Sequence, residues 1–246
     1  MSSSSQFRSE LRGGMRAFVE QQRQRFPEHE TLEIDLHCHD HNSDVPDERL
    51  GRILRCPETW TRTEQVLDAL EAAGMDAVTI TNHNNARTCW SLLERGVDVL
   101  VGAEFTCTVP DHDARVHVLT YGFSPAQEQQ LDALRFDLYR FLAYAREHDL
   151  VTVLAHPLFF ASGGVPPVEL IEKLTLLFDS FEVVNGQRDS WQNLLMAAWL
   201  ESLTGQRLEQ LARAHGIPTD AYCRHPHRKG MTGGSDCHFG LYVGTN

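Results

Sequence analysis

The sequence has no long hydrophobic run, and no stretch approaches the roughly 18 apolar residues that a membrane-spanning helix needs. Its first residues, Met1 to Ser5 followed by Gln6-Phe7-Arg8, also lack the apolar segment of a secretory signal. These two absences argue against a membrane partner and against export. The sequence therefore predicts a soluble, cytoplasmic protein.

Positive charge is also scarce, because 22 lysines and arginines stand against 34 aspartates and glutamates, for a formal net charge of −12. Proteins that follow a nucleic-acid backbone neutralise its phosphates with Lys and Arg, so this balance argues against nucleic acid as a partner. Three bound divalent cations would offset about six of the negative charges. The six cysteines form no C-x-x-C pair, which predicts reduced and mostly buried thiols.

The chain is long enough for one sizeable core, with 246 residues of which 41% are hydrophobic. This length falls within the range of α/β barrels that fold as single domains. Residues 1–30 are predicted to form a polar N-terminal extension that is partly helical, with a frayed start over 1–13 and a helix over 15–26. Residues 31–246 are predicted to form the main domain, and its oligomeric state is not determined by the sequence.

Hydrophobic periodicity predicts strands that alternate with helices. The expected strands are 32–36, 77–80, 97–105, 116–122, 151–154, 181–184 and 231–234, and the expected helices are 61–73, 86–94, 126–148, 168–177 and 191–214. Residues 45–60, with two prolines and a glycine, are interpreted as an inserted loop over the strand ends. This alternation predicts a mainly parallel sheet or barrel, whose ligands gather at the carboxyl ends of the strands.

Histidines and carboxylates occur where these predicted strands end, or in the loops that follow. Each offers a lone pair to a divalent cation, so a fold that gathers them makes a multi-metal site. Side chains alternate along a strand, which places the imidazoles of His37 and His39 on one face where they can share a metal. The predicted ligands are His37, His39, Asp44, His83, Glu104, His117, His156, Asp236 and His238.

The order of these motifs resembles that of the PHP family, named for polymerase and histidinol phosphatase. The resemblance runs from about residue 32 to 240 and rests on H-x-H at 37–39, Asp44, T-x-H at 81–83, Glu104, His117, H-P at 156–157 and D-x-H at 236–238. It implies a distorted (β/α)7 barrel with a trinuclear metal site at the C-terminal ends of the strands, and phosphoesterase activity. Residues 31–246 would then be the catalytic barrel, and truncation at the C-terminus stays open because the chain ends eight residues after His238.

The resemblance also implies how three metals would be shared among the ligands. His37, His39 and Asp236 would hold the first metal, Glu104 would bridge it to a second on His117 and His156, and Asp44, His83 and His238 would hold the third. Manganese, iron and zinc all suit this mixed donor set. Asn82 stands where the family has an aspartate before its histidine, which predicts weaker support for the third metal. His41 is a rival to Asp44, and the family pattern favours Asp44.

Two metals about 3.5 to 4 Å apart can activate a water and clamp phosphoryl oxygens. Glu104 is expected at the bridge because a carboxylate has two oxygens, and Asp236 is expected beside it in the catalytic centre. Four cationic residues lie near the motif-bearing loops: Arg87, Arg188, Arg228 and Lys229. Arg188 is favoured as a catalytic group, because residues 182–185 resemble the E-x-x-N strand end of the family and place the following loop over the pocket.

The leading functional hypothesis is a metal-dependent phosphatase or phosphodiesterase that acts on a small phosphorylated molecule. Two alternatives stay open. One is a nuclease acting on DNA or RNA, the activity of the PHP domains associated with polymerases, and it requires a basic groove. The other is a non-catalytic, metal-stabilised module of a larger protein. The sequence does not identify the substrate.

Overall fold

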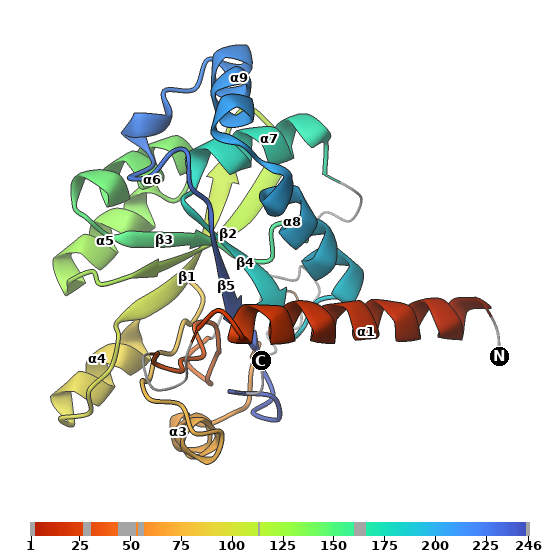
Figure 1. The fold of residues 1–246 in the computed structure, drawn as a ribbon. Coiled ribbons are helices and arrows are strands. Elements are labelled where there is room, and N and C mark those ends of the chain that lie inside the picture. The colour runs from red at the N-terminus through yellow and green to blue at the C-terminus, as the bar shows by residue number, and fades with distance from the viewer. Residues whose placement is uncertain are drawn as a thin grey trace.

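The computed structural model describes residues 3–26, 31–43, 53, 57–112, 114–159 and 166–244 (Figure 1). The predicted ligand Asp44 and most of the predicted insertion over 45–60 lie outside the described residues. None of the described helices is both long enough and apolar enough to cross a membrane.

The described strands form one five-stranded sheet in the order β1-β2-β3-β4-β5, and helices lie on its outer side (Figure 1). The strands are β1 Gly102–Val109, β2 Ala114–Tyr121, β3 Val151–Leu154, β4 Ser180–Asn185 and β5 Gly230–Gly234. β1, β2 and β3 pair antiparallel, whereas β3, β4 and β5 pair parallel. The expectation of a mainly parallel sheet is therefore met only in its second half. The connection between β1 and β2 is too short for the helical crossover that a parallel pair needs. β2 and β3 are antiparallel although α-helices connect them.

The predicted (β/α)7 barrel is not confirmed, since the hydrogen-bonded ladders of the described residues leave β1 and β5 as sheet edges. Residues 32–36 and 77–80, predicted as strands, join no ladder. Instead, isolated bridges link Cys38 to Cys237 and Val78 to Val99. The two segments therefore lie alongside the sheet without forming strands of it.

Carboxylates bond backbone N–H groups in and around the first of these segments, where Glu33 N donates to Oδ2 of Asp76 at 2.7 Å. Asp35 accepts hydrogen bonds from the backbone N–H of His37 (3.1 Å), Ser235 (2.8 Å) and Gly244 (2.8 Å). These donors would otherwise be available to a neighbouring strand, because each residue has only one backbone N–H. A buried carboxylate thus replaces part of the ladder and joins the start of the domain to its end.

Eight α-helices are described, and two of the predicted helices are each divided in two. They are α1 Ser3–Arg23, α3 Thr63–Ala72, α4 Arg87–Glu94, α5 Pro125–Leu134, α6 Leu138–Glu147, α7 Val168–Leu177, α8 Ser190–Ser202 and α9 Gly205–His215. The division of 126–148 falls at Asp137, whose carboxylate accepts from the N–H groups of Tyr139 and Arg140 and starts a new helix. Thr204 caps α9 in the same way by accepting from Arg207 N.

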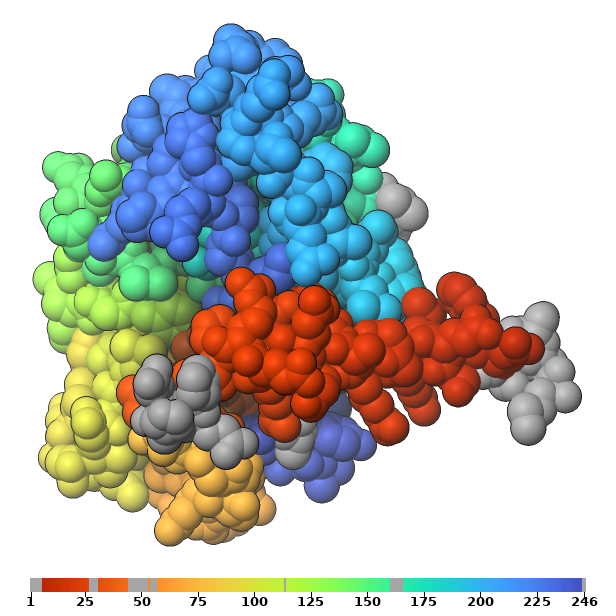
Figure 2. All heavy atoms as spheres, in the orientation of Figure 1, coloured from red at the N-terminus to blue at the C-terminus, as the bar shows by residue number. Residues whose placement is uncertain are grey.

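Large apolar side chains fill the core between sheet and helices, including the fully buried Phe105, Phe141, Phe178 and Phe181. Helix α1 lies outside this core, against α8, and its N-terminal half projects beyond the rest of the molecule (Figures 1 and 2). A Cβ placed on Gly14 would lie 3.4 Å from Leu194 Cδ1, so this glycine sits where the two helices meet. The helix begins at Ser3, and the predicted fraying of 1–13 is wrong for residues 3–13.

Candidate metal centre

The centre of the site is Glu104, a fully buried residue on β1. Its Oε2 lies 3.2 Å from Nε2 of His37 and 3.4 Å from Nε2 of His39. Its Oε1 lies 2.9 Å from Nδ1 of His117 and 3.1 Å from Nε2 of His156. Oε2 also lies 3.3 Å from Nδ1 of His83, so one oxygen of the carboxylate faces three imidazoles and the other faces two, as a bridging ligand would.

The first pair has a geometry that suits a cation. Oδ1 of Asp236 lies 3.5 Å from Nε2 of both His37 and His39, while Oε2 of Glu104 lies 3.2 and 3.4 Å from them. Ligands about 2.0 to 2.2 Å from a metal form a tetrahedron with edges of about 3.3 to 3.6 Å. The four measured edges therefore match a tetrahedral site.

Three of these donor atoms have no hydrogen-bond partner within the described structure. Nε2 of His37, Nε2 of His39 and Oε2 of Glu104 are buried and make no hydrogen bond. Buried polar atoms without partners are costly and uncommon. A divalent cation would satisfy all three at once, so the residues present fit a metal.

The second pair lies on the other side of Glu104. Nδ1 of His117, on β2, is 3.2 Å from Nε2 of His156, and both are close to Oε1 of Glu104. The backbone of His156 has a φ of 27°, and that of Asp236 has a φ of 51°. Positive φ is strained for residues other than glycine and is often found at functional sites. Both strained residues carry groups of this cluster.

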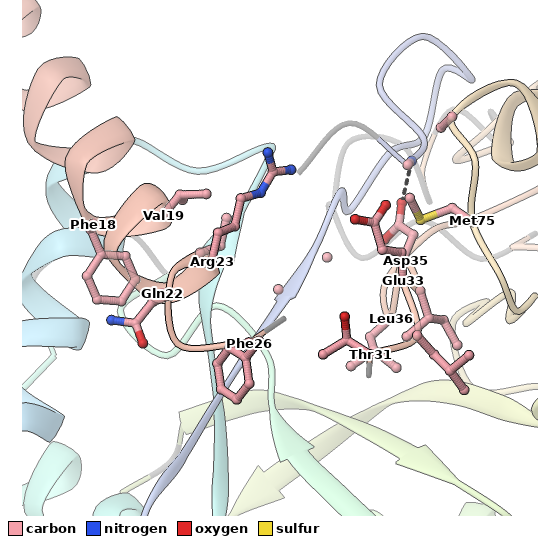
Figure 3. A pocket seen from close by; sticks show the side chains of 17 residues that line it. Phe18, Val19, Gln22, Arg23, Phe26, Thr31, Glu33, Asp35, Leu36 and Met75 are labelled. Atoms are coloured by element: carbon pink, nitrogen blue, oxygen red, sulfur yellow. Dashed lines mark hydrogen bonds between the residues drawn. The ribbon is translucent and has the colours of Figure 1, made fainter. Parts of the chain in front are cut away.

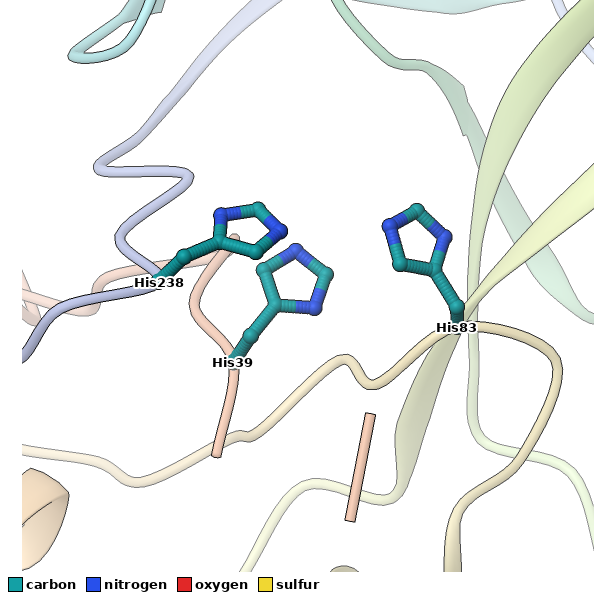
Figure 4. A group of neighbouring side chains, drawn as sticks. All are labelled: His39, His83 and His238. Atoms are coloured by element: carbon teal, nitrogen blue, oxygen red, sulfur yellow. The ribbon is translucent and has the colours of Figure 1, made fainter. Parts of the chain in front are cut away.

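A third group is formed by His39, His83 and His238, whose rings face a common space in Figure 4. The centroid of the His39 ring lies 4.9 Å from that of His83 and 4.2 Å from that of His238. The carboxylate of Glu58 closes this group, with Oε2 at 3.4 Å from Nε2 of His83 and Oε1 at 3.9 Å from Nε2 of His238. Ser43 Oγ donates to Glu58 Oε2 at 3.0 Å.

Sequence reasoning missed Glu58, because the loop that carries it has no motif that marks it as a ligand. The predicted ligand Asp44 lies outside the described residues, so its position is not compared with that of Glu58. Its rival His41 has a side chain that is 50% exposed, and its Nδ1 lies 3.9 Å from Oδ2 of Asp40. His41 belongs to none of the ligand groups found among the described residues.

Burial and neighbouring charges set the protonation of the cluster. Burial alone would raise the pKa of Glu104, but the imidazoles of His37, His83 and His117 outweigh it and hold the pKa well below its usual value. Burial lowers the pKa of His39 well below its usual value, and His238 lowers it further. Burial would also lower the pKa of His37, but the carboxylates of Glu104, Glu182 and Asp236 outweigh it and raise the pKa well above its usual value. Because metals bind the neutral imidazole and the ionised carboxylate, His37 must release a proton when a cation binds.

Glu182, on β4, is a second residue whose role the sequence did not reveal. Its Oε1 lies 2.9 Å from Nδ1 of His37, and its Oε2 accepts from the N–H of His156 and from Nδ2 of Asn185. Hydrogen bonding at Nδ1 turns Nε2 of His37 toward Glu104, as outer-sphere carboxylates do for metal-binding histidines. The E-x-x-N pattern at residues 182–185 is the sequence signal that could have identified Glu182, but it supported only the choice of Arg188.

β5 approaches this assembly closely through a glycine. A Cβ on Gly234 would overlap Cβ of His37 and lie 2.7 Å from Oε1 of Glu182. Any side chain at this position would displace the imidazole or its carboxylate partner. Gly234 is therefore required for the packing of His37 rather than for turn geometry.

Among the four predicted cationic residues, Arg188 contacts the cluster. Its Nη2 donates to Oδ2 of Asp236 at 3.0 Å, and its guanidinium carbon lies 3.7 Å from the centroid of the Phe159 ring. The other three lie elsewhere. Arg87 donates to Asn42 O, while Lys229 donates to Phe178 O, and Arg228 and Lys229 both precede β5, whose far end leads to Asp236.

A cavity of about 560 Å³ lies between α1 and residues 31–36 (Figure 3). Its wall includes the apolar side chains of Phe18, Phe26 and Met75, and none of the predicted ligands lines it. This cavity is large, but it is not the candidate reactive site, because its lining contains no group of metal-binding side chains. The chemistry is concentrated around Glu104.

No family model matches this sequence, and no curated protein matches it either. Several solved structures are similar, including the following two. An amidohydrolase from Chromobacterium violaceum, solved with bound sulfate and without metal, is 16% identical, with a TM-score of 0.52 over 86% of this chain and 90% of that one. A provisionally assigned metal-dependent phosphoesterase from Bifidobacterium adolescentis is 16% identical, with a TM-score of 0.48 over 83% of this chain and 87% of that one. The first likeness shows a shared fold.

Proposed function

We propose that this protein is a metal-dependent phosphoesterase, which hydrolyses a phosphate mono- or diester of a small molecule at a trinuclear centre. The observation that carries the proposal is the carboxylate of Glu104, whose two oxygens face separate sets of imidazoles, three at Oε2 and two at Oε1. Bridging carboxylates hold two cations at the short separation that in-line attack on phosphorus requires.

The described donor groups divide among three positions. His37, His39 and Asp236 would hold the first cation, His117 and His156 the second, with Glu104 between them, and His83 and His238 the third together with Asp44, Glu58 or both. Manganese, iron and zinc suit these donors. Bound there, divalent cations would supply a water of lowered pKa and polarise the phosphoryl oxygens.

Residues of the chain would orient and support this chemistry. Glu182 holds the ring of His37 in place through Nδ1, and Arg188 fixes Asp236 through its second oxygen. The guanidinium of Arg188 also adds positive charge beside the centre, where negative charge grows on the phosphoryl oxygens during hydrolysis. The five described cysteines are buried and free, which fits a reducing compartment such as the cytoplasm.

The test combines metal analysis with a substrate panel. Protein purified without added metal is analysed for manganese, iron and zinc, reconstituted with each, and assayed with aryl phosphates, alkyl phosphates, phosphodiesters and amides. We expect up to three equivalents of metal and release of phosphate, both lost in His37→Ala and Asp236→Ala. His41→Ala is the matched control and should keep full activity, because its side chain lies outside the ligand groups.

The proposal fails if fully metal-loaded protein hydrolyses no phosphoester in the panel. Turnover of amides alone would assign the site to amide hydrolysis, the class of the C. violaceum protein with the same fold. If chelation lowers the melting temperature while no substrate is turned over at any metal loading, the metals have a structural role only.

A further inference from the structure

A second cavity, of about 440 Å³, lies where α1 meets the start of α8, at the carboxyl end of β4. Three arginines line it, Arg8 and Arg12 from α1 and Arg188 from the loop after β4. The lining contains one carboxylate, that of Asp189. The cavity is therefore locally positive in a chain whose formal net charge is −12.

The two arginines of α1 are placed for joint use. Residues four apart on a helix lie on the same face, so Arg8 and Arg12 point to one side of α1. Both are exposed, and neither forms an ion pair with a carboxylate of the described residues. Their charges are thus available to a ligand in the cavity.

Arg188 connects this cavity to the proposed metal centre. One of its terminal nitrogens donates to Asp236, and its guanidinium packs over Phe159, whose ring centroid lies 5.5 Å from that of His156. Its Nε is buried and makes no hydrogen bond within the described structure. A single side chain thus joins a predicted metal ligand, Asp236, to the cavity that the arginines of α1 also line.

We propose that the substrate carries a second anionic group, a phosphate or a carboxylate, and that Arg8 and Arg12 bind it in this cavity. The inference rests on the proposed function, because the first anionic group is the phosphoester at the metal centre. Guanidinium groups suit both anions, since their paired N–H donors match the spacing of two oxygens. Asp189 opposes an anion there, and the two arginines of α1 outweigh its single charge.

The test uses three substrates that share a butyl chain. Butyl phosphate has one anionic group, 4-phosphonooxybutanoate adds a carboxylate, and butane-1,4-diol bisphosphate adds a phosphate. The double variant Arg8→Gln/Arg12→Gln is compared with Arg16→Gln, an exposed arginine of α1 that lines neither cavity. All are assayed after reconstitution with manganese, and circular dichroism verifies that each variant is folded.

We expect the wild type to prefer a doubly anionic substrate over butyl phosphate by roughly tenfold or more in kcat/KM, and the better of the two identifies the second group. The double variant should lose this preference through a higher KM while kcat/KM for butyl phosphate stays within about twofold of wild type. Salt should weaken the preference, because exposed charges are screened. Arg16→Gln should behave as wild type.

Three results overturn the inference while the proposed function stands. The first is a wild type that hydrolyses butyl phosphate and shows no preference for a second anion. The second is a preference that survives the double variant unchanged, and the third is a double variant that loses all three substrates equally. If the wild type hydrolyses none of the three and no other phosphoester, the proposed function fails and the inference fails with it.

Discussion

Two buried polar clusters lie side by side in this protein, and they are satisfied in opposite ways. In the Asp40 cluster, formed by Asp40, Thr63, Asn82 and Thr88, Asp40 accepts hydrogen bonds from Asn82 Nδ2 (2.7 Å), Thr63 Oγ1 (2.5 Å) and Thr88 Oγ1. In the Glu104 cluster, formed by the imidazoles and carboxylates of the candidate metal centre, Oε2 of Glu104 makes no hydrogen bond. Burial alone does not distinguish the two clusters, because the carboxylates of Asp40 and Glu104 are both fully buried.

The difference teaches how to tell a structural carboxylate from a binding one. A buried carboxylate whose oxygens already accept several hydrogen bonds needs no ligand, whereas one surrounded by donor atoms without partners is incomplete. Asn82 belongs to the first kind of cluster, in which the buried carboxylate already has hydrogen-bond partners. Its amide nitrogen donates to Oδ1 of Asp40 at 2.7 Å, and its amide oxygen accepts from Asp40 N at 2.9 Å. The expectation that this amide weakens the third metal site stays a prediction.

The largest effect should come from removing the charge of the Glu104 cluster. Glu104→Gln keeps the size of the side chain but leaves one oxygen and one NH₂ group where two oxygens faced the imidazoles. We expect kcat/KM for an aryl phosphate to fall by about a thousandfold or more, because a bridging ligand acts on two cations. Elemental analysis should show fewer bound metals.

If Glu104→Gln kept its bound metals and its activity, the proposed contrast between the Glu104 cluster and the Asp40 cluster would be wrong. A variant that is merely unfolded would be recognised by circular dichroism and excluded. Asp40→Asn is the matched change in the other cluster and should keep its bound metals.

The next largest effect should come from adding a charge to the Asp40 cluster. In Asn82→Asp, a second carboxylate would lie where Nδ2 is now 2.7 Å from Oδ1 of Asp40. Two buried carboxylates in contact repel, and we expect the free energy of unfolding to fall by about 3 to 5 kcal/mol. Urea denaturation of the metal-free protein measures this loss.

The exchange variant Asp40→Asn/Asn82→Asp is the control for this prediction. It restores one carboxylate and one amide in the same space, so at least half of the lost stability should return. Equal losses in the single and exchange variants would show that shape, and not charge, limits this cluster.

The described histidines and carboxylates that the sequence singled out lie close together, whereas the sheet departs from its prediction. His37 and His39 could be placed on one face because side chains alternate along an extended chain, and that placement needs no ladder. The strand expected over 32–36 does not form. Glu33 N donates to Oδ2 of Asp76 instead, and the carboxylate of Asp35 accepts from the N–H groups of His37, Ser235 and Gly244. Such side-chain substitution depends on contacts with Ser235 and Gly244, which are about 200 residues away and invisible to local patterns.

Residues that act through other residues were the ones that the sequence could not identify. Glu182 is recognisable only by its distance to His37, and Glu58 only by its distances to His83 and His238. The long helix expected over 126–148 was divided because Asp137, an acceptable helix residue by periodicity, caps a new helix instead. Local periodicity located the groups, and tertiary contacts decided their partners.

A moderate effect should come from the support of the Glu104 cluster. Glu182→Gln leaves an amide opposite Nδ1 of His37, which weakens a 2.9 Å contact without touching the ligand atoms. We expect metal affinity to fall by about 10- to 100-fold, measured by competition with a chelator, while the activity at saturating metal changes less. Loss of activity that added metal does not restore would show that Glu182 does more than orient the ring.

The smallest effect should come from removing one donor of the Asp40 cluster. Thr63→Val deletes the hydroxyl that bonds Oδ2 of Asp40, at the first residue of α3, and leaves that oxygen to Thr88 Oγ1 at 2.9 Å. We expect a loss of about 1 to 3 kcal/mol in the free energy of unfolding, because a buried acceptor loses one of its partners. Metal content and kcat/KM should stay at wild-type values. If metal content falls as well, the two clusters are coupled, since Asp40 follows His39 directly in the chain and would shift that ligand when its own partners change.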